Sequence, residues 1–294
     1  MNSITKYARL VKFSHTIFAM PFALMSFVYA VTQSGVSDAQ SNPWWWVTLL
    51  VQVVLCMVFA RNVAMGFNRW ADRFIDAENP RTRDREIPAG RVSPQSAVAF
   101  IVVNALCFVI LASTINSLCG WLSPVALAVV MFYSYCKRFT ALAHLVLGIS
   151  LGIAPVGATI AVTSTITMES IILSLVVMTW CAGFDIIYAL QDADYDRQRG
   201  LHSIPSRFSA TTSLAISALL HAASIALLLW YASYQPQSWL LYVGCALFIA
   251  IVSSEHYIVT PKRQRNIGIA FGTFNALASM SLALFLIANL LIFG

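Results

Sequence analysis

Of the 294 residues, 59% are apolar and only 10% are charged. A soluble domain usually carries about 25% charged residues, so this composition excludes an ordinary soluble domain and predicts an integral membrane protein. The formal net charge of +6 would suit a nucleic-acid partner, but nearly all basic residues stand at the ends of apolar segments, where membrane topology accounts for them. We therefore expect a lipid bilayer, and no nucleic acid, as a partner of this chain.

Apolar segments follow one another along the whole chain. A hydrocarbon core of about 30 Å needs roughly 20 apolar residues of helix, and nine segments meet that length. They cover about residues 14–32, 45–67, 95–115, 119–136, 141–163, 168–190, 210–233, 238–259 and 267–293. The sequence predicts an all-α integral membrane protein, with nine transmembrane helices in one bundle and a single domain over residues 1–294.

The links between these segments alternate in charge. The links near 33–44, 116–118, 164–167 and 234–237 contain no Lys or Arg, whereas the intervening ends hold nearly all of them. Because Lys and Arg favour the cytoplasmic side, we expect a cytoplasmic N-terminus and Gly294 on the far side. No Arg- and Ser-rich transit peptide precedes the first segment, which favours a bacterial plasma (inner) membrane.

Aspartates gather in two segments that both leave the membrane on the predicted cytoplasmic side. All of them except Asp38 fall there. At about 100° per residue, each segment, if helical, presents a stripe of polar side chains on one face. The first stripe consists of Arg61, Asn68, Asp72 and Asp76, and the second of Asp185, Asp192 and Asp196 with Tyr188 beside them.

Such stripes are unfavourable without a counter-charge. Carboxylates one turn apart repel each other, and burial near a bilayer adds to the cost. Mg²⁺ prefers oxygen ligands and is typically held by one or two carboxylates together with substrate phosphates. We therefore predict Mg²⁺ between the stripes, bridging to a diphosphate. Basic residues expected to take the remaining phosphate charge are Arg61, Arg69, Arg73, Lys137 and Arg138.

Solvated loop charges are the alternative interpretation of these residues. We expect it to hold for Asp84, Glu86, Arg81, Arg83 and Asp194. The i,i+4 pairs Asp72/Asp76 and Asp192/Asp196 at one membrane face are hard to obtain by chance. We therefore do not interpret these four residues as solvated loop charges. His15 and His144 have no partner visible in the sequence and are assigned no role.

Two other classes of membrane protein compete with an enzyme that acts on a diphosphate. A cation-coupled transporter binds ions through carboxylates near the bilayer midplane, whereas these acids sit at helix ends on one side, as suits a surface-facing active site. A CDP-alcohol phosphotransferase would carry a longer D-G-x-x-A-R signature, which this sequence lacks.

At these residues the chain resembles the UbiA superfamily of membrane prenyltransferases, over essentially its whole length. The N-x-x-x-D-x-x-x-D signature stands at Asn68–Asp76, D-x-x-x-D at Asp192–Asp196, and Y-x-x-x-K at Tyr133–Lys137. Some relatives carry an Asp four residues after that lysine, where this chain has Ala141. "YSYCKRFTALAHLVLGISLGIAP" and "IPAGRVS" are similar to 4-hydroxybenzoate polyprenyltransferases of ubiquinone biosynthesis, whereas "GFDIIYALQDADYDRQRGLHSIPSRF" is similar to a bacterial subgroup in which some members act on a dihydroxynaphthoate for menaquinone.

The resemblance implies Mg²⁺-dependent transfer of a polyprenyl group from polyprenyl diphosphate to a hydroxylated aromatic acid. It favours 4-hydroxybenzoate, attacked at the carbon beside the hydroxyl (C3), as acceptor, with a dihydroxynaphthoate as the alternative. The implied metal ligands are Asn68, Asp72, Asp76, Asp192 and Asp196.

The resemblance also implies roles for the other polar residues. Lys137 and Arg138 would hold the diphosphate, and Arg61 would pair with the acceptor carboxylate. Asp185 would orient or deprotonate the acceptor hydroxyl. A mutual ion pair between Arg61 and Asp185 is the alternative for those two residues.

Overall fold

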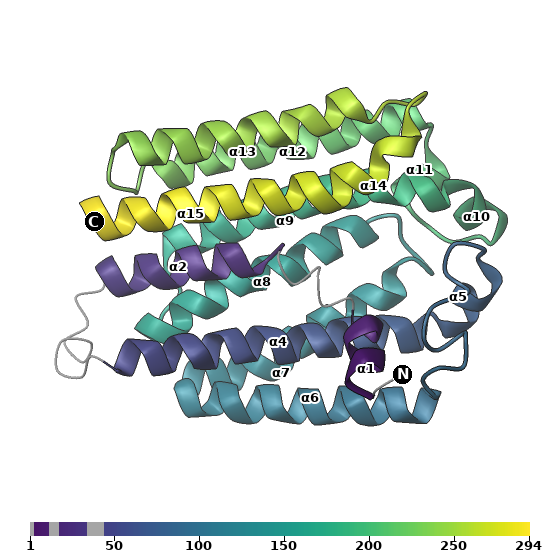
Figure 1. The fold of residues 1–294 in the computed structure, drawn as a ribbon, viewed down its shortest axis with the longest axis horizontal. Helices are drawn as coiled ribbons and strands as arrows, with labels where there is room; N and C mark the ends of the chain where they lie inside the picture. Colours follow the sequence, from purple (N-terminus) through teal and green to yellow (C-terminus); the bar gives the residue numbers. More distant parts are fainter. Residues whose placement is uncertain (1–2, 12–17, 34–43) are drawn as a thin grey trace.

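The structure, a computed structural model, describes residues 3–11, 18–33 and 44–294. Every element in these ranges is a helix, which confirms the all-α class. The long helices are α2 (Met20–Gln33), α4 (Trp45–Ala71), α6 (Pro94–Ile115), α7 (Ser117–Cys136), α8 (Ala143–Thr163), α9 (Met168–Ala189), α12 (Ala210–Ala232), α13 (Trp239–Ile258) and α15 (Asn275–Phe293). They lie side by side in one bundle (Figure 1).

Within the described ranges, eight helices are long and apolar enough to cross a membrane, with mean hydropathies of 1.5 to 2.6. The first predicted segment, 14–32, is represented by α2, which has only 14 residues. The beginning of that segment, with His15, and most of the link that carries Asp38 lie outside the described residues. The count of nine spans and the cytoplasmic N-terminus therefore stay predictions.

Short polar residues at the predicted links begin several of the helices. The side chains of Ser93, Asn116, Thr167 and Ser209 each accept a hydrogen bond from a backbone N–H in the first turn of α6, α7, α9 and α12, respectively. Such caps satisfy amide groups that have no partner within the helix. The links can therefore be short, and consecutive helices pack as neighbours.

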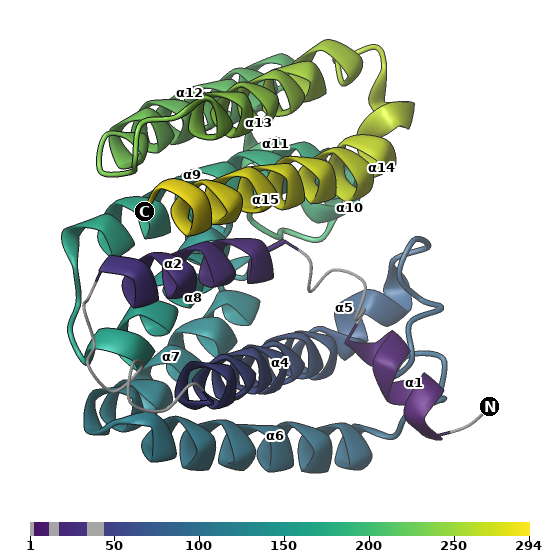
Figure 2. The same cartoon turned by 60° about the vertical axis from the view of Figure 1, so that its left-hand side comes forward.

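Helix α9 lies inside the bundle. Figure 2 shows layers that run from α12 and α13, through α9 and α15, then α2 and α8, to α4, α7 and α6. Trp180 of α9 is fully buried and its ring contacts Phe22 of α2 and Phe248 of α13. On outer helices, large apolar side chains such as Ile110 and Leu284 are exposed, as expected for a surface that faces lipid.

Helices α8 and α9 approach each other closely through glycines. A Cβ at Gly148 would overlap the carbonyl oxygen of Met178, and one at Gly152 would stand 2.8 Å from that of Ser174. These contacts confirm the packing role that small residues often have between membrane helices. Gly157, further along α8, has open space at the Cβ position and does not contribute to this crossing.

The short helices gather at one end of the bundle. These are α5 (Arg73–Glu78), the 3₁₀ turn η2 (Leu190–Asp192), α10 (Ala193–Gln198) and α11 (Ile204–Arg207). The C-terminus lies at the opposite end (Figure 1). The two aspartate-rich segments therefore share one end, as predicted. A further acid, Glu255 near the end of α13, is fully buried.

The remaining described elements are α1 (Ser3–Leu10), η3 (Gln264–Asn266), α14 (Ile267–Ile269) and the π-helical turn η4 (Ala270–Phe274). Helix α1 is held by the stacking of Tyr7 on Phe100 of α6, with ring centroids 4.9 Å apart. Helix α14 and the π-helical turn lead directly into α15. None of these elements contributes a side chain to the pocket described below.

Gly148→Ala is expected to lower the free energy of unfolding by about 1–3 kcal/mol, because the added methyl group must push α8 away from the Met178 carbonyl. Thermal unfolding of the detergent-solubilised protein measures the effect. Gly157→Ala is the matched control, since its methyl group enters open space, and its midpoint should equal or exceed that of the wild type. Equal midpoints for the two variants would contradict the close crossing.

Candidate active site

The first aspartate motif lies where α4 passes into α5. The helix breaks at Asp72, yet its backbone N–H still bonds to the carbonyl of Asn68 (2.9 Å), and that of Asp76 bonds to the carbonyl of Asp72 (2.7 Å). This helical succession keeps the three side chains on one face. The second motif follows α9 through the turn η2 into α10, which carries Asp192 and Asp196 inward, both nearly fully buried.

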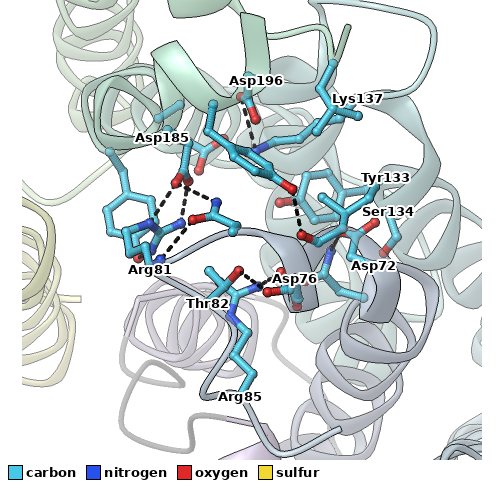
Figure 3. Close-up of a pocket in the computed structure, with 18 residues that line it drawn as sticks. Asp72, Asp76, Arg81, Thr82, Arg85, Tyr133, Ser134, Lys137, Asp185 and Asp196 are labelled. Carbon is cyan, nitrogen blue, oxygen red and sulfur yellow. Dashed lines mark hydrogen bonds and ion pairs between the residues drawn. The ribbon is translucent and has the colours of Figure 1, made fainter. Parts of the chain in front are cut away.

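The two motifs line a single pocket of about 110 Å³. The predicted site residues that the structure brings together around it are Asn68, Asp72, Asp76, Lys137, Asp185, Tyr188, Asp192 and Asp196. The labelled side chains that Figure 3 shows directed toward this space are Asp72, Asp76, Tyr133, Lys137, Asp196 and, from the link after α5, Arg81, Thr82 and Arg85. Asp192 lines the same pocket. The predicted meeting of the two acidic stripes is therefore present in the fold.

Asp192 is held by the link that follows α5. Arg81 donates to both of its carboxylate oxygens, through Nε to Oδ1 at 2.7 Å and through Nη2 to Oδ2. Asn79 adds a hydrogen bond of 3.2 Å to Oδ1, and Arg81 also donates to the Tyr188 hydroxyl at 2.9 Å. Burial lowers the pKa of the Arg81 guanidinium, but its bonds to Asp192 outweigh burial and the pKa is raised. Arg81 thus carries a full charge in the site.

The carboxylates of the first motif are also paired. Arg85 donates to Oδ1 of Asp76 at 2.6 Å, and Arg138 donates to Oδ1 of Asp72 at 3.0 Å. Asn68 donates to the other oxygen of Asp72 at 3.1 Å. Burial, and then the charge of Asp76, raise the pKa of Asp72 to about 6, although Arg138 opposes the shift. Burial and the neighbouring acid together therefore outweigh the cations that surround Asp72.

Asp196 has weaker partners. Ser203 donates to its Oδ2 at 3.0 Å, and the Lys137 ammonium stands 4.0 Å from the same oxygen. Burial lowers the pKa of Lys137, but the charges of Asp196, Asp185 and neighbouring acids outweigh burial and the pKa is raised. Lys137 is therefore a charged ammonium at the pocket wall.

Direct contacts join the two acidic segments around the pocket. The Tyr195 hydroxyl donates to the carbonyl of Ile75 at 2.8 Å, and Arg199 pairs with Glu78 at 2.8 Å. The Lys137 carbonyl accepts from the His202 backbone N–H at 2.7 Å, which ties the link after α7 to the same assembly. Three links far apart in the sequence thus hold one another around the carboxylates.

The donor set fits a hard divalent cation. Oδ2 of Asp76 is buried and accepts no hydrogen bond from the described residues. A cation beside Asp72 would offset both its burial and the charge of Asp76, which together raise its pKa. In the described chain, however, no three His, Cys, Asp or Glu side chains gather closely enough to hold an ion by themselves. An ion here would need ligands from both motifs, with Asn68 or a substrate phosphate completing the set.

Arg81 corrects the prediction for the charges after α5. We expected a solvated charge with at most weak surface pairing. Arg81 is exposed, but the prediction was wrong about its pairing, because its guanidinium forms a bidentate pair with the buried Asp192. Glu86 is buried rather than solvated. The prediction holds for Asp84 and Arg83, which are exposed, and for Asp194, whose side chain is 91% exposed.

Several predicted basic residues lie outside the pocket lining. Arg61 and Arg69 are on α4, and Arg69 is buried. Arg73 donates to the carbonyl of Trp70 and lies over the rings of Trp70 and Phe74. Arg138 reaches the site only through Asp72 and the carbonyl of Ala71. The phosphate-binding and acceptor-binding roles of these arginines stay predictions.

Asp185 pairs with a residue that the sequence did not single out. Its Oδ2 stands 2.7 Å from Nδ1 of the fully buried His144, so the alternative of an ion pair with Arg61 is not what the structure has. Tyr133, Asn79, Thr82 and Arg85 line the pocket as well. Of these, only Tyr133 carried a signal, as the first residue of Y-x-x-x-K.

Comparison with known proteins identifies the family of this chain. The UbiA prenyltransferase family matches residues 19–284. A 4-hydroxybenzoate octaprenyltransferase of Serratia proteamaculans is 33% identical over 221 residues, 74% of this chain and 75% of that protein. The enzyme of the same name from Burkholderia ambifaria is 30% identical over 233 residues, 77% of each chain.

Solved structures of the same family share the fold. The apo structure of a UbiA homolog from Aeropyrum pernix K1 is 27% identical, with a TM-score of 0.76 over 95% of this chain and 97% of that one. A UbiA homolog from Archaeoglobus fulgidus, bound to GPP and Mg²⁺, has a TM-score of 0.68 at 19% identity, over 94% of this chain and 99% of that one. On the family match and the identities together, the chain belongs to the UbiA prenyltransferase family and is a multi-pass membrane enzyme.

Proposed function

We propose that this enzyme transfers a polyprenyl group from polyprenyl diphosphate to the ring carbon beside the hydroxyl of a hydroxylated aromatic acid. The favoured acceptor is 4-hydroxybenzoate, in ubiquinone biosynthesis, and a dihydroxynaphthoate is the alternative. The observation that carries the proposal is the pocket in which two Asp motifs face arginines and a lysine. The names of the similar Serratia and Burkholderia enzymes support the choice of acceptor.

The charges of the pocket suit a diphosphate held with a divalent cation. Asn68, Asp72 and Asp76 from one motif and Asp192 and Asp196 from the other would hold Mg²⁺. When bound, Mg²⁺ supplies positive charge that stabilises the leaving diphosphate. The GPP and Mg²⁺ in the Archaeoglobus structure support this assignment.

The cations of the pocket would bind the phosphate oxygens. Lys137 is charged and lines the pocket, and Arg81 and Arg85 already orient their guanidinium groups there through Asp192 and Asp76. Guanidinium groups bind phosphate in a planar, bidentate manner. Because the pocket of about 110 Å³ is smaller than the roughly 300–1,000 Å³ typical of ligand sites, these side chains must move when the donor binds.

The membrane setting suits the two substrates. A polyprenyl tail prefers lipid to water by about 0.8 kcal/mol per buried CH₂, so the tail would lie among the helices or in the bilayer. The diphosphate and the aromatic acid would enter from the end of the bundle that carries the pocket. We assign that end to the cytoplasmic face of a bacterial plasma membrane, from the alternation of basic links.

Membranes that contain the enzyme, incubated with labelled prenyl diphosphate, Mg²⁺ and either 4-hydroxybenzoate or a dihydroxynaphthoate, test the proposal. Lipid-soluble labelled product with 4-hydroxybenzoate would support the favoured acceptor. Product with the naphthoate alone would select the alternative. Absence of product with both acids would contradict the proposed function, whereas movement of a cation without prenyl transfer would favour a transporter.

Asp72→Asn and Asp192→Asn are each expected to reduce prenyl transfer about 100-fold or more, because each replaces a charged ligand by a neutral amide of the same shape. Initial rates on purified protein at saturating donor measure the loss. Asp194→Asn is the matched control, since Asp194 is exposed and pairs only with Arg197, and its rate should equal that of the wild type. Undiminished activity in either motif variant would refute the ligand assignment.

Removal of divalent cations is expected to abolish prenyl transfer and to be reversible. Purified enzyme treated with EDTA should show no transfer, and excess Mg²⁺ should restore it, because the carboxylates of the two motifs would repel a diphosphate without a bridging cation. A binding assay with labelled prenyl diphosphate is the second readout, in which retention on the enzyme should also require Mg²⁺. Full binding in EDTA would show that the arginines and Lys137 alone suffice.

A further inference from the structure

Asp185 belongs to the pocket but not to either aspartate motif. It lies on α9 near its end and lines the pocket beside Tyr133 and Ser134. Its Oδ2 is bonded to His144, whereas Oδ1 accepts no hydrogen bond from any residue in the described ranges. One oxygen is thus fixed and the other is available to a ligand in the pocket.

The hydrogen bonds of His144 define which of its nitrogens carries a proton. The backbone N–H of Ile204 donates to Nε2 at 3.3 Å, so that nitrogen is the acceptor. In a neutral imidazole the other nitrogen then carries the hydrogen, and Nδ1–H donates to Asp185 at 2.7 Å. His144 is fully buried and reaches the pocket only through Asp185.

The start of α11 holds His144 in this orientation. Ile204 is the first residue of α11, and its neighbour Ser203 caps that helix and donates to Asp196 at 3.0 Å. Ile204 also packs with Ala141 and Ile186 in a small buried cluster. The same turn therefore touches the second aspartate motif on one side and His144 on the other.

We propose that His144 is a positioning residue, which fixes the Asp185 carboxylate so that Oδ1 accepts the proton of the acceptor hydroxyl during prenyl transfer. This inference rests on the proposed function. The hydroxyl proton passes to Asp185, and the ring carbon beside the oxygen forms the new C–C bond. The allylic C–O bond breaks and leaves its electron pair on the diphosphate. The ring carbon then passes its own proton to an oxygen of the released diphosphate, which restores aromaticity, and the phenolic oxygen is reprotonated from Asp185.

A carboxylate with one oxygen tied down is well placed for this task. A base must stand within hydrogen-bond reach of its proton, and a small displacement costs a large part of the rate. His144 restrains the rotation of the Asp185 carboxylate without adding a charge. The inference also predicts selectivity for acceptors that carry a hydroxyl group beside the reacting carbon.

Two isosteric variants separate the contacts of His144. His144→Asn keeps a nitrogen donor near the position of Nδ1, whereas His144→Gln keeps an acceptor near Nε2 and loses the donor to Asp185. We expect His144→Gln to lower kcat for 4-hydroxybenzoate about 10- to 100-fold, and His144→Asn to retain most of it. The KM for prenyl diphosphate should stay within about twofold in both variants, because neither touches the phosphate site.

A more acidic acceptor tests the proton transfer itself. A ring-fluorinated 4-hydroxybenzoate loses its hydroxyl proton more readily, so the loss in His144→Gln relative to the wild type should shrink with this acceptor. His256→Gln is the matched control, since His256 hydrogen-bonds to His221 away from the pocket, and its rates should match the wild type with both acceptors. Thermal unfolding of each variant verifies folding.

The outcomes distinguish failure of the positioning role from failure of the proposed function. Three results would overturn the positioning role while leaving the proposed function intact. They are an equal fall in kcat in the two His144 variants, an equal fall with the two acceptors, and a raised KM for prenyl diphosphate. Wild-type enzyme that prenylates neither phenolic acid would refute both. Should His144→Gln fail to fold, Asp185→Asn provides the same test from the other partner, and a loss that the fluorinated acceptor does not reduce would overturn the proposal.

Discussion

Charge pairing at the end of the helical bundle is the constraint on which the rest of the structure depends. Carboxylates that are almost fully withdrawn from water are costly unless a cation or hydrogen-bond donors compensate them. The chain meets that requirement with its own side chains. The pairs are Arg81 with Asp192, Arg85 with Asp76, Arg138 with Asp72, and Lys137 with Asp196.

These pairs also determine the shape of the links at this end of the bundle. In three of the pairs the cation and the carboxylate come from different links, and in the fourth, Arg85 with Asp76, they are nine residues apart. The pairs therefore hold the links after α4, α7 and α9 around a common space. The same electrostatics would recognise a metal–diphosphate complex, which presents both a cation for the carboxylates and anionic oxygens for the arginines and lysine. The site is thus assembled by the type of interaction that it would use on its substrate.

Sequence reasoning succeeded where a regular repeat carries the information. Hydropathy and length predicted eight helices that the described residues contain at spanning length, whereas the first predicted span is represented by the shorter α2. The spacing of Asn68, Asp72 and Asp76 predicted a shared face, which exists because backbone bonds continue across the helix break. Sequence reasoning failed for Arg81, because the link after α5 is not a regular helix. Its side-chain directions therefore cannot be predicted from residue spacing. Glu86 was misjudged for the same reason.

The contact between Asp185 and His144 could not be predicted from the residue pattern of either segment alone. His144 lies 41 positions away on another helix, and only the crossing of α8 and α9 brings the two together. A lone histidine in an apolar segment is compatible with simple packing, so the sequence offered no reason to prefer this contact.

The glycine crossing between α8 and α9 has a consequence for chemistry as well as for packing. Gly148 lies one turn from His144, and the same two helices carry His144 and Asp185. The backbones of α8 and α9 are in close contact at Gly148 and Met178, so the two helices cannot come closer together. Their separation at this point determines how far the His144 imidazole extends toward the Asp185 carboxylate. A bulkier residue at position 148 would therefore move the imidazole of His144 relative to Asp185 as well as destabilise the helix crossing.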